Sequence, residues 1–328
     1  MQSAKIKIIK NRTFISHLVS FYSHTELRKL VLHLDLNNTI LVSDAITGQG
    51  TVAALDYFLT TVTWGKMGKH GNGTRTASHT HTRHNRTRDL FSSCSVGHNS
   101  YSELSVKGED GRLYHWILPS FFQLLKDLVQ DGREFAIVFR TFGSDLPRAL
   151  RAVSRALNEG AHPLFPDLAD LKISVNMSPG KIRCSKRGIV LSRVEDHVST
   201  RDGERGLYQY LSSVQGLGGF QDHFDWWASN TFSIRGGKPL WVDPFDQHVQ
   251  HIFIDDNIRM NDEDTIVQPK VFLDPGGSET RLACTFELYD ITLVQNNLLR
   301  AISDLNYFTE RVHICLENYE RNLQQGAG

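Results

Sequence analysis

The chain has 328 residues and equal numbers of basic and acidic side chains, 36 of each, so its formal net charge at pH 7 is zero. A chain of this length holds two domains or one α/β domain with an insertion, and its balanced charge gives no argument for a nucleic-acid or membrane-surface partner. No apolar run approaches the roughly 18 residues that a membrane-spanning helix needs, and the four cysteines are widely spaced, as is typical of a reducing compartment.

We expect residues 1–28 to form an N-terminal arm outside the folded core. The first 25 residues contain no acidic side chain, and their basic side chains are Lys5, Lys7, Lys10 and Arg12. Two interpretations fit this composition: a frayed basic arm, and an organellar transit peptide. We favour the arm, which predicts a cytoplasmic protein, with organellar targeting as the alternative.

The first predicted strand covers residues 29–34 and is followed by Asp35. Its near-continuous apolar run, LVLHL, is typical of a strand that is buried on both faces of a parallel sheet. The turn-forming residues Asn37, Asn38 and Thr39 come next. Ligands of open α/β sheets bind beyond the carboxyl ends of the strands, so Asp35 stands where a site residue is expected. An Asx turn that merely closes the strand is the alternative interpretation.

The next two segments are predicted to be inserted after this strand. Residues 52–62 carry apolar side chains at helical spacing, which fits either a small cap over the site or a helix of the core. Residues 65–105 are rich in Gly, Thr, His, Arg and Asn, and we predict a disordered polar insertion. Binding of a metal, phosphate, nucleic acid or another partner by its histidines and arginines is the alternative. The α/β core then comprises residues 29–64 and 106–328.

Helix, strand and helix are predicted in succession after the insertion. Pro119 opens the first helix and Gly132 follows its end. The strand FAIVFRT ends in Thr141, and the second helix covers 146–158 after a Ser144–Asp145 N-cap. This alternation indicates a parallel α/β sheet. Thr141 is therefore expected at the same sheet edge as Asp35.

The segment from 161 to 236 carries weaker patterns. Short strands are predicted at 173–177 and 188–191, as well as at 113–118 before the first helix, and helices at 204–214 and 221–229. The last of these helices contains Trp226 and Trp227. Packing is the commoner use of such a pair, and stacking on a substrate ring is the alternative.

A second apolar strand, VQHIFI, ends at Asp255 and Asp256. Two strands that deliver carboxylates to one sheet edge form an anionic pocket, which is costly unless a cation fills it, and an all-oxygen set suits Mg²⁺. The acidic loop at 261–264 either supplies an outer carboxylate or forms a solvated turn. Beyond it we predict an edge strand at 266–273, because of Pro269, and one long helix over 288–323 that packs on the sheet or mediates dimerisation.

Four of these features resemble, in order, the motifs of the haloacid dehalogenase (HAD) superfamily, whose best-populated branch is the Mg²⁺-dependent phosphatases. The motifs are a strand ending Asp-x-Asp-x-Thr, a strand ending in Ser or Thr, a Gly-Lys-Pro lysine and a strand ending in paired acids; here they correspond to Asp35–Thr39, Thr141, Gly237–Pro239 and Asp255–Asp256. The resemblance implies a Rossmann-like, HAD-type α/β fold. In that fold, helices sandwich a parallel sheet and a small cap or insertion follows the first strand.

The resemblance also implies a nucleophile and a metal site. Asp35 attacks phosphorus and forms an aspartyl-phosphate. Mg²⁺ is held by Asp35, by the main-chain carbonyl of Asn37, and by Asp255 or Asp256. The activity implied is that of a Mg²⁺-dependent phosphohydrolase.

The remaining motif residues are expected to hold the substrate. Thr141 and Lys238 bind the phosphoryl oxygens and neutralise their charge, and Asn38 and Thr39 contact the substrate. The partner implied is a small phosphorylated molecule or a phosphoprotein, with no membrane or nucleic acid. Lys238 is favoured for its role over three other lysines, Lys172, Lys181 and Lys186.

One residue departs from the family pattern, because Asn37 stands where the second aspartate of the first motif is expected. That aspartate protonates the leaving group and later activates water, whereas an amide has no proton to exchange near neutral pH. General acid–base catalysis is worth about 10²- to 10⁴-fold in rate. The sequence therefore predicts a slow or specialised phosphohydrolase that favours good leaving groups, such as acyl or aryl phosphates. A non-catalytic pseudophosphatase or binding module is the alternative.

Overall fold

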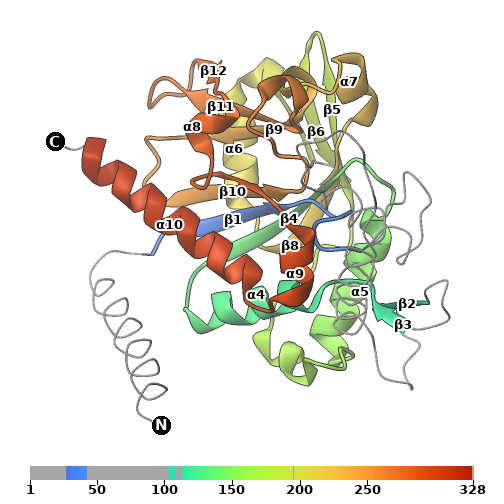
Figure 1. Ribbon diagram of the computed structural model, residues 1–328. Coiled ribbons are helices and arrows are strands. Elements are labelled where there is room, and N and C mark those ends of the chain that lie inside the picture. Colours follow the sequence, from blue (N-terminus) through green and yellow to red (C-terminus); the bar gives the residue numbers. More distant parts are fainter. Residues whose placement is uncertain (1–26, 43–102, 108–112, 195, 327–328) are drawn as a thin grey trace, which may run out of the picture.

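The computed structural model describes residues 27–42, 103–107, 113–194 and 196–326, and these form a mixed α/β fold around one large sheet (Figure 1). The strands from β13 to β5 run parallel to their neighbours, whereas β6 and β7 add an antiparallel edge. The order across the sheet is β13 (Leu293–Gln295), β10 (Val249–Asp255), β1 (Lys29–Leu34), β4 (Phe135–Thr141), β8 (Gly216–Gln221), β5 (Gly180–Ser185), β6 (Gly188–Arg193) and β7 (Asp196–Ser199).

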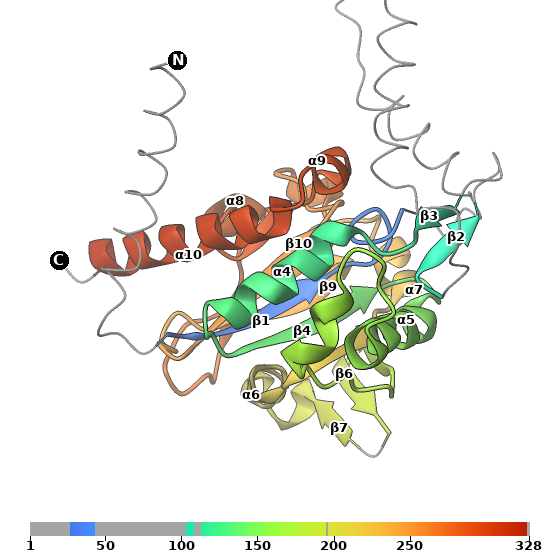
Figure 2. The same ribbon diagram turned by 90° about the horizontal axis from the view of Figure 1, so that it is seen from below.

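Strand β1 lies inside this sheet and is buried on both faces, as its apolar run predicts. Leu30, Leu32 and Leu34 belong to one core cluster and Val31 to another, because successive side chains of a strand point to opposite faces. The first cluster is formed with four helices, which cover that face (Figure 2). They are α4 (Pro119–Gln130), α5 (Leu146–Glu159), α9 (Leu298–Ser303) and α10 (Tyr307–Gly326).

The sequence predicts helices on both faces of the sheet, but the other face is covered by one helix and a second sheet. Helix α6 (Glu204–Ser213) packs there together with a second sheet, which contributes Trp241 and Phe272 to the core. This sheet has the order β12 (Thr280–Leu282), β11 (Val267–Phe272) and β9 (Lys238–Val242). The strand predicted at 266–273 is confirmed as β11, but its predicted position at a sheet edge is wrong, since β11 is the middle strand. Pro269 lacks an N–H donor, but its carbonyl accepts a hydrogen bond from the Ala283 N–H (3.0 Å).

The prediction of one long helix over 288–323 is also wrong. The chain instead forms α8 (Thr285–Leu288), β13, α9 and α10. Leu293 and Val294 are fully buried and extend the main sheet beside β10, and the Asn297 side chain caps α9 by accepting from the Arg300 N–H (3.1 Å). A strand of three residues cannot be distinguished from a helix by apolar spacing alone.

The segment from 161 to 236 contains three strands that were not predicted from the sequence, β5, β7 and β8. In place of the predicted strand at 173–177, Val175 forms an isolated bridge with Leu217. Strand β8 reads GLGGFQ, and its glycines weaken the strand signal. Gly219 is required by packing, because a Cβ there would lie 2.5 Å from Leu146 Cδ1. The helix predicted at 221–229 begins later, as α7 (Phe224–Ser229).

The two helices predicted after Pro119 are confirmed as α4 and α5. Pro119 starts α4, and Gly160 ends α5 in the left-handed conformation (φ 59°). Four short 3₁₀ turns complete the described helices: Pro166–Leu171, Thr200–Asp202, Ile234–Gly236 and Asp262–Asp264. Within the described ranges Cys184, Cys284 and Cys315 are free thiols, and the helices there are too short or too polar to cross a bilayer.

Most of the predicted insertion and nearly all of the predicted N-terminal arm lie outside the described residues. The helix predicted at 52–62, and with it the small cap, also lies outside them. The last residues assigned to the insertion are an exception. Leu104 and Ser105 are buried, and Ser105 begins β2 (Ser105–Lys107), which pairs with β3 (Leu113–His115). The predicted boundary at residue 105 is therefore too late.

Candidate active site

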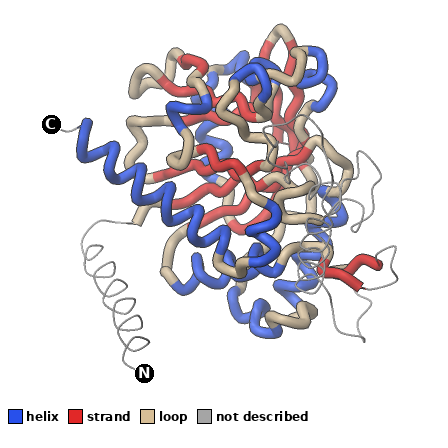
Figure 3. The backbone as a smooth tube through the Cα atoms, in the orientation of Figure 1, coloured by secondary structure: helices blue, strands red, loops and turns tan. Residues whose placement is uncertain are grey.

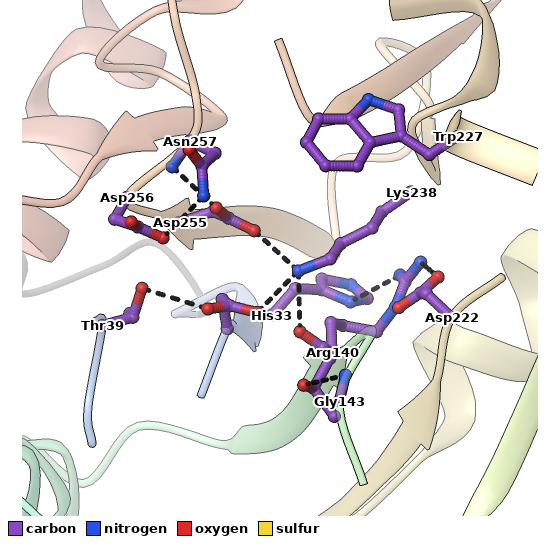
Figure 4. Close-up of polar contacts among 12 residues, drawn as sticks. His33, Thr39, Arg140, Gly143, Asp222, Trp227, Lys238, Asp255, Asp256 and Asn257 are labelled. Atoms are coloured by element: carbon purple, nitrogen blue, oxygen red, sulfur yellow. Dashed lines mark hydrogen bonds and ion pairs between the residues drawn. The ribbon is translucent and has the colours of Figure 1, made fainter. Parts of the chain in front are cut away.

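Three carboxylates meet where strands β1 and β10 end (Figure 4). These strands are parallel neighbours with Leu34 opposite Ile254, so Asp35 and Asp255 leave the sheet side by side. Oxygen atoms of Asp35, Asp255 and Asp256 lie within 4.8 Å of one another. Asp35 and Asp255 are buried and Asp256 is half-buried. The predicted convergence of the two strand ends is confirmed.

The ammonium group of Lys238 lies between two of these carboxylates. Its Nζ donates to Asp35 Oδ1 (2.6 Å), to Asp255 Oδ2 (2.8 Å) and to the main-chain carbonyl of Arg140 (3.0 Å). The side chain is buried, so these contacts satisfy a charge that would otherwise be costly. The choice of Lys238 over three other lysines is supported, because the others are exposed: Lys172, Lys181 and Lys186.

Lys238 reaches the site from the second sheet rather than from the turn that its Gly-Lys-Pro context predicts. It is the first residue of β9, and its N–H donates to the Ile266 carbonyl (2.6 Å). A Cβ on Gly237 would lie 2.5 Å from that same carbonyl oxygen. Glycine therefore lets the two backbones approach closely enough for the lysine to enter between the strand ends.

The charges of this group are only partly balanced. Burial raises the pKa of Asp35, Lys238 opposes the rise and Asp255 adds to it, with a result of about 7. Burial, Asp255 and Asp35 also raise the pKa of Asp256 well above its ordinary value. Burial disfavours the charge of Lys238, but Asp255 and Asp35 outweigh it and raise the lysine pKa. With all three carboxylates ionised, the group and its one ammonium would carry two negative charges, which a divalent cation would neutralise; without a cation, the raised pKa values of Asp35 and Asp256 favour protonation instead.

The donor set fits Mg²⁺, which prefers carboxylate, carbonyl and water oxygens. A buried oxygen beside it supports this fit. Asn296 donates its N–H to the Asp255 carbonyl (3.0 Å) and its side-chain amide to the Asn38 carbonyl (2.9 Å). Its Oδ1 is buried and has no partner among the described residues. Such an atom suits a hydrogen bond from an ordered water, of the kind Mg²⁺ retains.

The two residues predicted to bind substrate have other surroundings. Thr39 is fully buried, and its hydroxyl donates to Asp35 Oδ2 (3.4 Å), so it contacts the predicted nucleophile. Asn38 has φ 57°, and its carbonyl accepts from Asn296. Both residues therefore shape the turn that presents Asp35, and their contact with a substrate stays a prediction.

Thr141 and Asn37 lie close together around Gly143. Thr141 is buried at the end of β4, and its hydroxyl accepts a hydrogen bond from the Gly143 N–H (2.9 Å), which leaves its proton available to a ligand. A Cβ on Gly143 would lie 3.0 Å from the Asn37 amide nitrogen, 3.4 Å from the Thr141 hydroxyl and 3.6 Å from an Asp145 carboxylate oxygen. The three polar groups thus surround Gly143. Asp145 stands at the N-cap of α5 without a side-chain capping bond.

The sequence analysis missed Arg140, which fixes Lys238. Arg140 is fully buried, and its guanidinium pairs with Asp222 through Nε (2.9 Å) and Nη2 (2.7 Å). Nη2 also donates to the carbonyl of Pro239, the residue after Lys238 (3.0 Å). The Arg140 carbonyl also accepts a hydrogen bond from Lys238 Nζ. Arg140 therefore holds the lysine in two ways, through the backbone of the following residue and through the ammonium group. The signal was an arginine inside an apolar strand, FAIVFRT, next to Thr141.

A chain of neutral histidines continues from Arg140 under the site. His33 Nδ1 lies 3.4 Å from Arg140 Nη1, His33 Nε2 lies 3.0 Å from His251 Nδ1, and His251 Nε2 lies 2.9 Å from the Ser212 hydroxyl. Burial, His251 and Arg140 lower the pKa of His33, and burial is also the main cause that lowers the pKa of His251 to about 3. Neutral rings satisfy every contact if each Nε2 carries the proton.

The loop after β10 is held by hydrogen bonds of Asn257, which do not involve the acidic segment at 261–264. Asn257 donates its N–H to Asp255 Oδ1 (2.8 Å) and its amide to Asp256 Oδ1 (3.1 Å). Asp262 accepts from the Thr285 N–H, and Asp264 pairs with Arg259. These contacts favour the solvated-turn interpretation of the acidic loop.

Comparison with known proteins assigns no family to this arrangement. The chain matches no family model, no curated protein and no solved structure.

Proposed function

We propose that the chain is a Mg²⁺-dependent phosphohydrolase of the HAD type that acts through an aspartyl-phosphate on Asp35. The observation that carries the proposal is the contact of Lys238 with both Asp35 and Asp255, with Asp256 within 4.8 Å of them. Support for a HAD-type fold comes from the sheet, in which β1 lies between β10 and β4. All four motifs then meet at one sheet edge, in the arrangement that the sequence resemblance implies.

Asp35, the main-chain carbonyl of Asn37, and Asp255 or Asp256 would hold the metal. When bound, Mg²⁺ supplies a positive charge that orients the phosphoryl group and stabilises its developing charge. Asn257 and Asn296 keep the β10 end in position through their hydrogen bonds to Asp255 and Asp256.

Asp35 acts as the nucleophile. One carboxylate oxygen attacks phosphorus, the bond from phosphorus to the leaving oxygen breaks, and that oxygen departs with the electron pair. Lys238 and Thr141 donate hydrogen bonds to the phosphoryl oxygens, so Lys238 exchanges its contact with Asp35 for one with the substrate. Water then attacks the phosphorus of the aspartyl-phosphate, which releases phosphate and regenerates the Asp35 carboxylate.

Asn37 limits this reaction. Its amide can donate a hydrogen bond but cannot transfer a proton to the leaving oxygen. Turnover should therefore depend on how well the leaving group departs without protonation, and the missing acid–base contribution is about 10²- to 10⁴-fold.

Phosphate release from a panel of phosphate esters, with and without Mg²⁺, tests the proposal. We expect Mg²⁺-dependent release that Asp35→Asn abolishes. The matched control is Asp170→Asn, which removes an exposed carboxylate outside the three-carboxylate group. Release that is absent throughout the panel, or that survives Asp35→Asn, would contradict a phosphohydrolase centred on Asp35.

A non-catalytic binding module is the second candidate, and Asn37 is the residue that favours it. The substitution Asn37→Asp separates the two candidates. If Mg²⁺-dependent hydrolysis occurs in Asn37→Asp and is undetectable in the natural chain, the natural protein is a pseudophosphatase. If the natural chain hydrolyses activated esters, it is an enzyme.

A further inference from the structure

Four aromatic side chains form a cluster next to the candidate active site. The three shortest of its ring pairs are Phe142 with Trp227 (ring centroids 5.2 Å apart and 17° between planes), Phe142 with Phe224 (5.7 Å), and Trp227 with Phe232 (5.0 Å). We call Phe142, Phe224, Trp227 and Phe232 the aromatic cluster. Three of its members are half-buried, and Phe232 is 45% exposed. The cluster therefore presents aromatic surface to solvent.

The cluster is continuous with the predicted phosphoryl site. Phe142 directly follows Thr141, and its ring centroid lies 5.0 Å from Lys238 Nζ. Trp227, drawn with Lys238 in Figure 4, is connected to this site through its stacking on Phe142. The indole is fixed by a hydrogen bond from its Nε1 to the Thr265 carbonyl (3.2 Å). An ester bound through Lys238 and Thr141 therefore has aromatic rings within reach of its organic group.

The exposed member of the cluster is held by an unusual backbone. Thr231 and Phe232 have φ 57° and 58°, a conformation that side chains other than glycine rarely adopt. The Phe232 N–H donates to the Trp227 carbonyl (3.0 Å), which fixes this turn against α7. Two consecutive residues of this kind cost free energy, and such strain gathers at ligand-binding segments.

The chemistry of Asn37 restricts the leaving group independently. Without a proton donor, the leaving oxygen must depart as an anion. A phenol has a pKa of about 10, against about 16 for water, which an aliphatic alcohol resembles. A phenolate is thus a far better leaving group than an alkoxide. An acyl phosphate meets this requirement too, but a simple acyl group gains nothing from an aromatic surface, whereas a phenyl ring stacks on it.

We propose that the substrate class is the phosphate monoester of a phenol, with a tyrosyl phosphate as the form that proteins carry. This inference rests on the proposed function. The Asp35 carboxylate attacks the dianionic aryl phosphate, the phosphorus–oxygen bond to the ring breaks, and a phenolate leaves with the electron pair. Water hydrolyses the aspartyl-phosphate, and the proton that this step releases converts the phenolate to the phenol. The products are the phenol, hydrogen phosphate and regenerated Asp35.

Binding separates this inference from the proposed function, because it needs no turnover. Phenylphosphonate and methylphosphonate carry the same phosphonate group and cannot be hydrolysed at a phosphorus–oxygen ester bond. Calorimetric titration of the full chain with Mg²⁺ should show tighter binding of phenylphosphonate. Phe232→Ala should weaken that binding by about 2- to 10-fold and leave methylphosphonate binding unchanged. The matched control is Phe286→Ala, which removes another exposed phenylalanine, 75% exposed on α8.

Turnover provides the second arm. Phenyl phosphate, a phosphotyrosyl peptide, acetyl phosphate and phosphoserine are compared in the natural chain and in Trp227→Leu. We expect both aryl esters to exceed phosphoserine in kcat/KM, and Trp227→Leu to reduce aryl turnover more than acetyl phosphate turnover. A higher kcat/KM for the peptide than for phenyl phosphate would identify the tyrosyl residue of a protein as the source. Phe232 is exposed, so Phe232→Ala provides the same comparison if Trp227→Leu does not fold.

Two failures are distinguishable. If phenylphosphonate binds no more tightly than methylphosphonate, or Phe232→Ala weakens both equally, the aryl inference is wrong even where acetyl phosphate is hydrolysed through Asp35. If no ester is hydrolysed in an Asp35-dependent way, the proposed phosphohydrolase fails. Selective phenylphosphonate binding would then support aryl-phosphate recognition by a binding module.

Discussion

Replacing Lys238 by methionine should destabilise the protein strongly, because the lysine is the one ammonium in direct contact with the three-carboxylate group in the described part of the chain. Methionine keeps most of the aliphatic volume and removes the charge and its three hydrogen bonds. Asp35 and Asp255 then remain buried without their partner. Breaking a buried ion pair from one side costs about 3 to 5 kcal/mol. Because Asp35 already has a raised pKa and can take up a proton, we expect the lower end of this range at pH 7.

Thermal unfolding followed by circular dichroism measures this loss. A cost of about 3 kcal/mol corresponds to a fall in Tm of roughly 6 to 12 °C for a domain of this size class. The exposed Lys186→Met is the matched control and should change Tm by no more than about 2 °C. Mg²⁺ should raise the Tm of Lys238→Met more than that of the natural chain, since it replaces the missing positive charge; saturation at 100 times Kd contributes about 2.7 kcal/mol.

Two results would refute this reasoning. One is a Tm for Lys238→Met that equals the Tm of Lys186→Met, which would mean that the ammonium group does not stabilise the carboxylates. The other is an identical Tm increase with Mg²⁺ in both proteins, which would mean that the cation and Lys238 do not share the same charge environment.

Three further predictions concern the site and the core. Asn37→Asp should raise turnover of alkyl phosphates by about 10²- to 10⁴-fold, measured as phosphate release from phosphoserine; no gain would show that position 37 is not the acid–base position. Arg140→Met should leave Asp222 buried and unpaired, lower the free energy of unfolding measured by urea titration by about 3 to 5 kcal/mol, and reduce kcat because Lys238 is displaced; an unchanged free energy of unfolding would contradict the ion-pair role. Burial lowers the pKa of His115 to about 4, and burial together with His115 lowers the pKa of His162 to about 3. A histidine of the unfolded chain has a pKa near 6.5, so at pH values between the folded and unfolded pKa the unfolded chain binds more protons than the folded protein. The contribution of these two histidines to stability should therefore be full above pH 6.5 and fall as pH drops toward 4, and His115→Phe should flatten the pH dependence measured in urea titrations; an equally steep dependence in that variant would oppose the assignment.

The core of the sheet could be predicted because its strands are long and apolar. Strands β1, β4 and β10 each carry a near-continuous apolar run ended by a polar residue, and helices α4 and α5 have a proline in the first turn and end near glycine. These local signals agree with the tertiary structure. The residues at the strand ends were therefore predicted to meet, and Asp35 and Asp255 do.

Elements were missed where tertiary packing overrides local preference. Two of the three glycines of strand β8 are set by tertiary packing: Gly216 has φ 64° and lies against Ser174, and a Cβ on Gly219 would lie 2.5 Å from Leu146 Cδ1 of α5 and 2.9 Å from Phe139 Cβ of β4. Strand β13 is only three residues long and lies inside an apolar pattern with helical spacing. The partners Arg140 and Asp222 lie 82 positions apart, and no local pattern joins them. Each polar residue inside an apolar strand, such as His33, was nevertheless a visible signal.

A manganese-soaked crystal tests the central claim most directly, because Mn²⁺ scatters anomalously and accepts the same oxygen ligands as Mg²⁺. The account predicts one anomalous peak at the ends of β1 and β10, bonded to oxygens of Asp35 and of Asp255 or Asp256 at about 2.1 to 2.2 Å. Absence of a peak there at saturating Mn²⁺, with Lys238 still bridging Asp35 and Asp255, would show that the lysine alone completes the carboxylate group and would contradict a metal-dependent site.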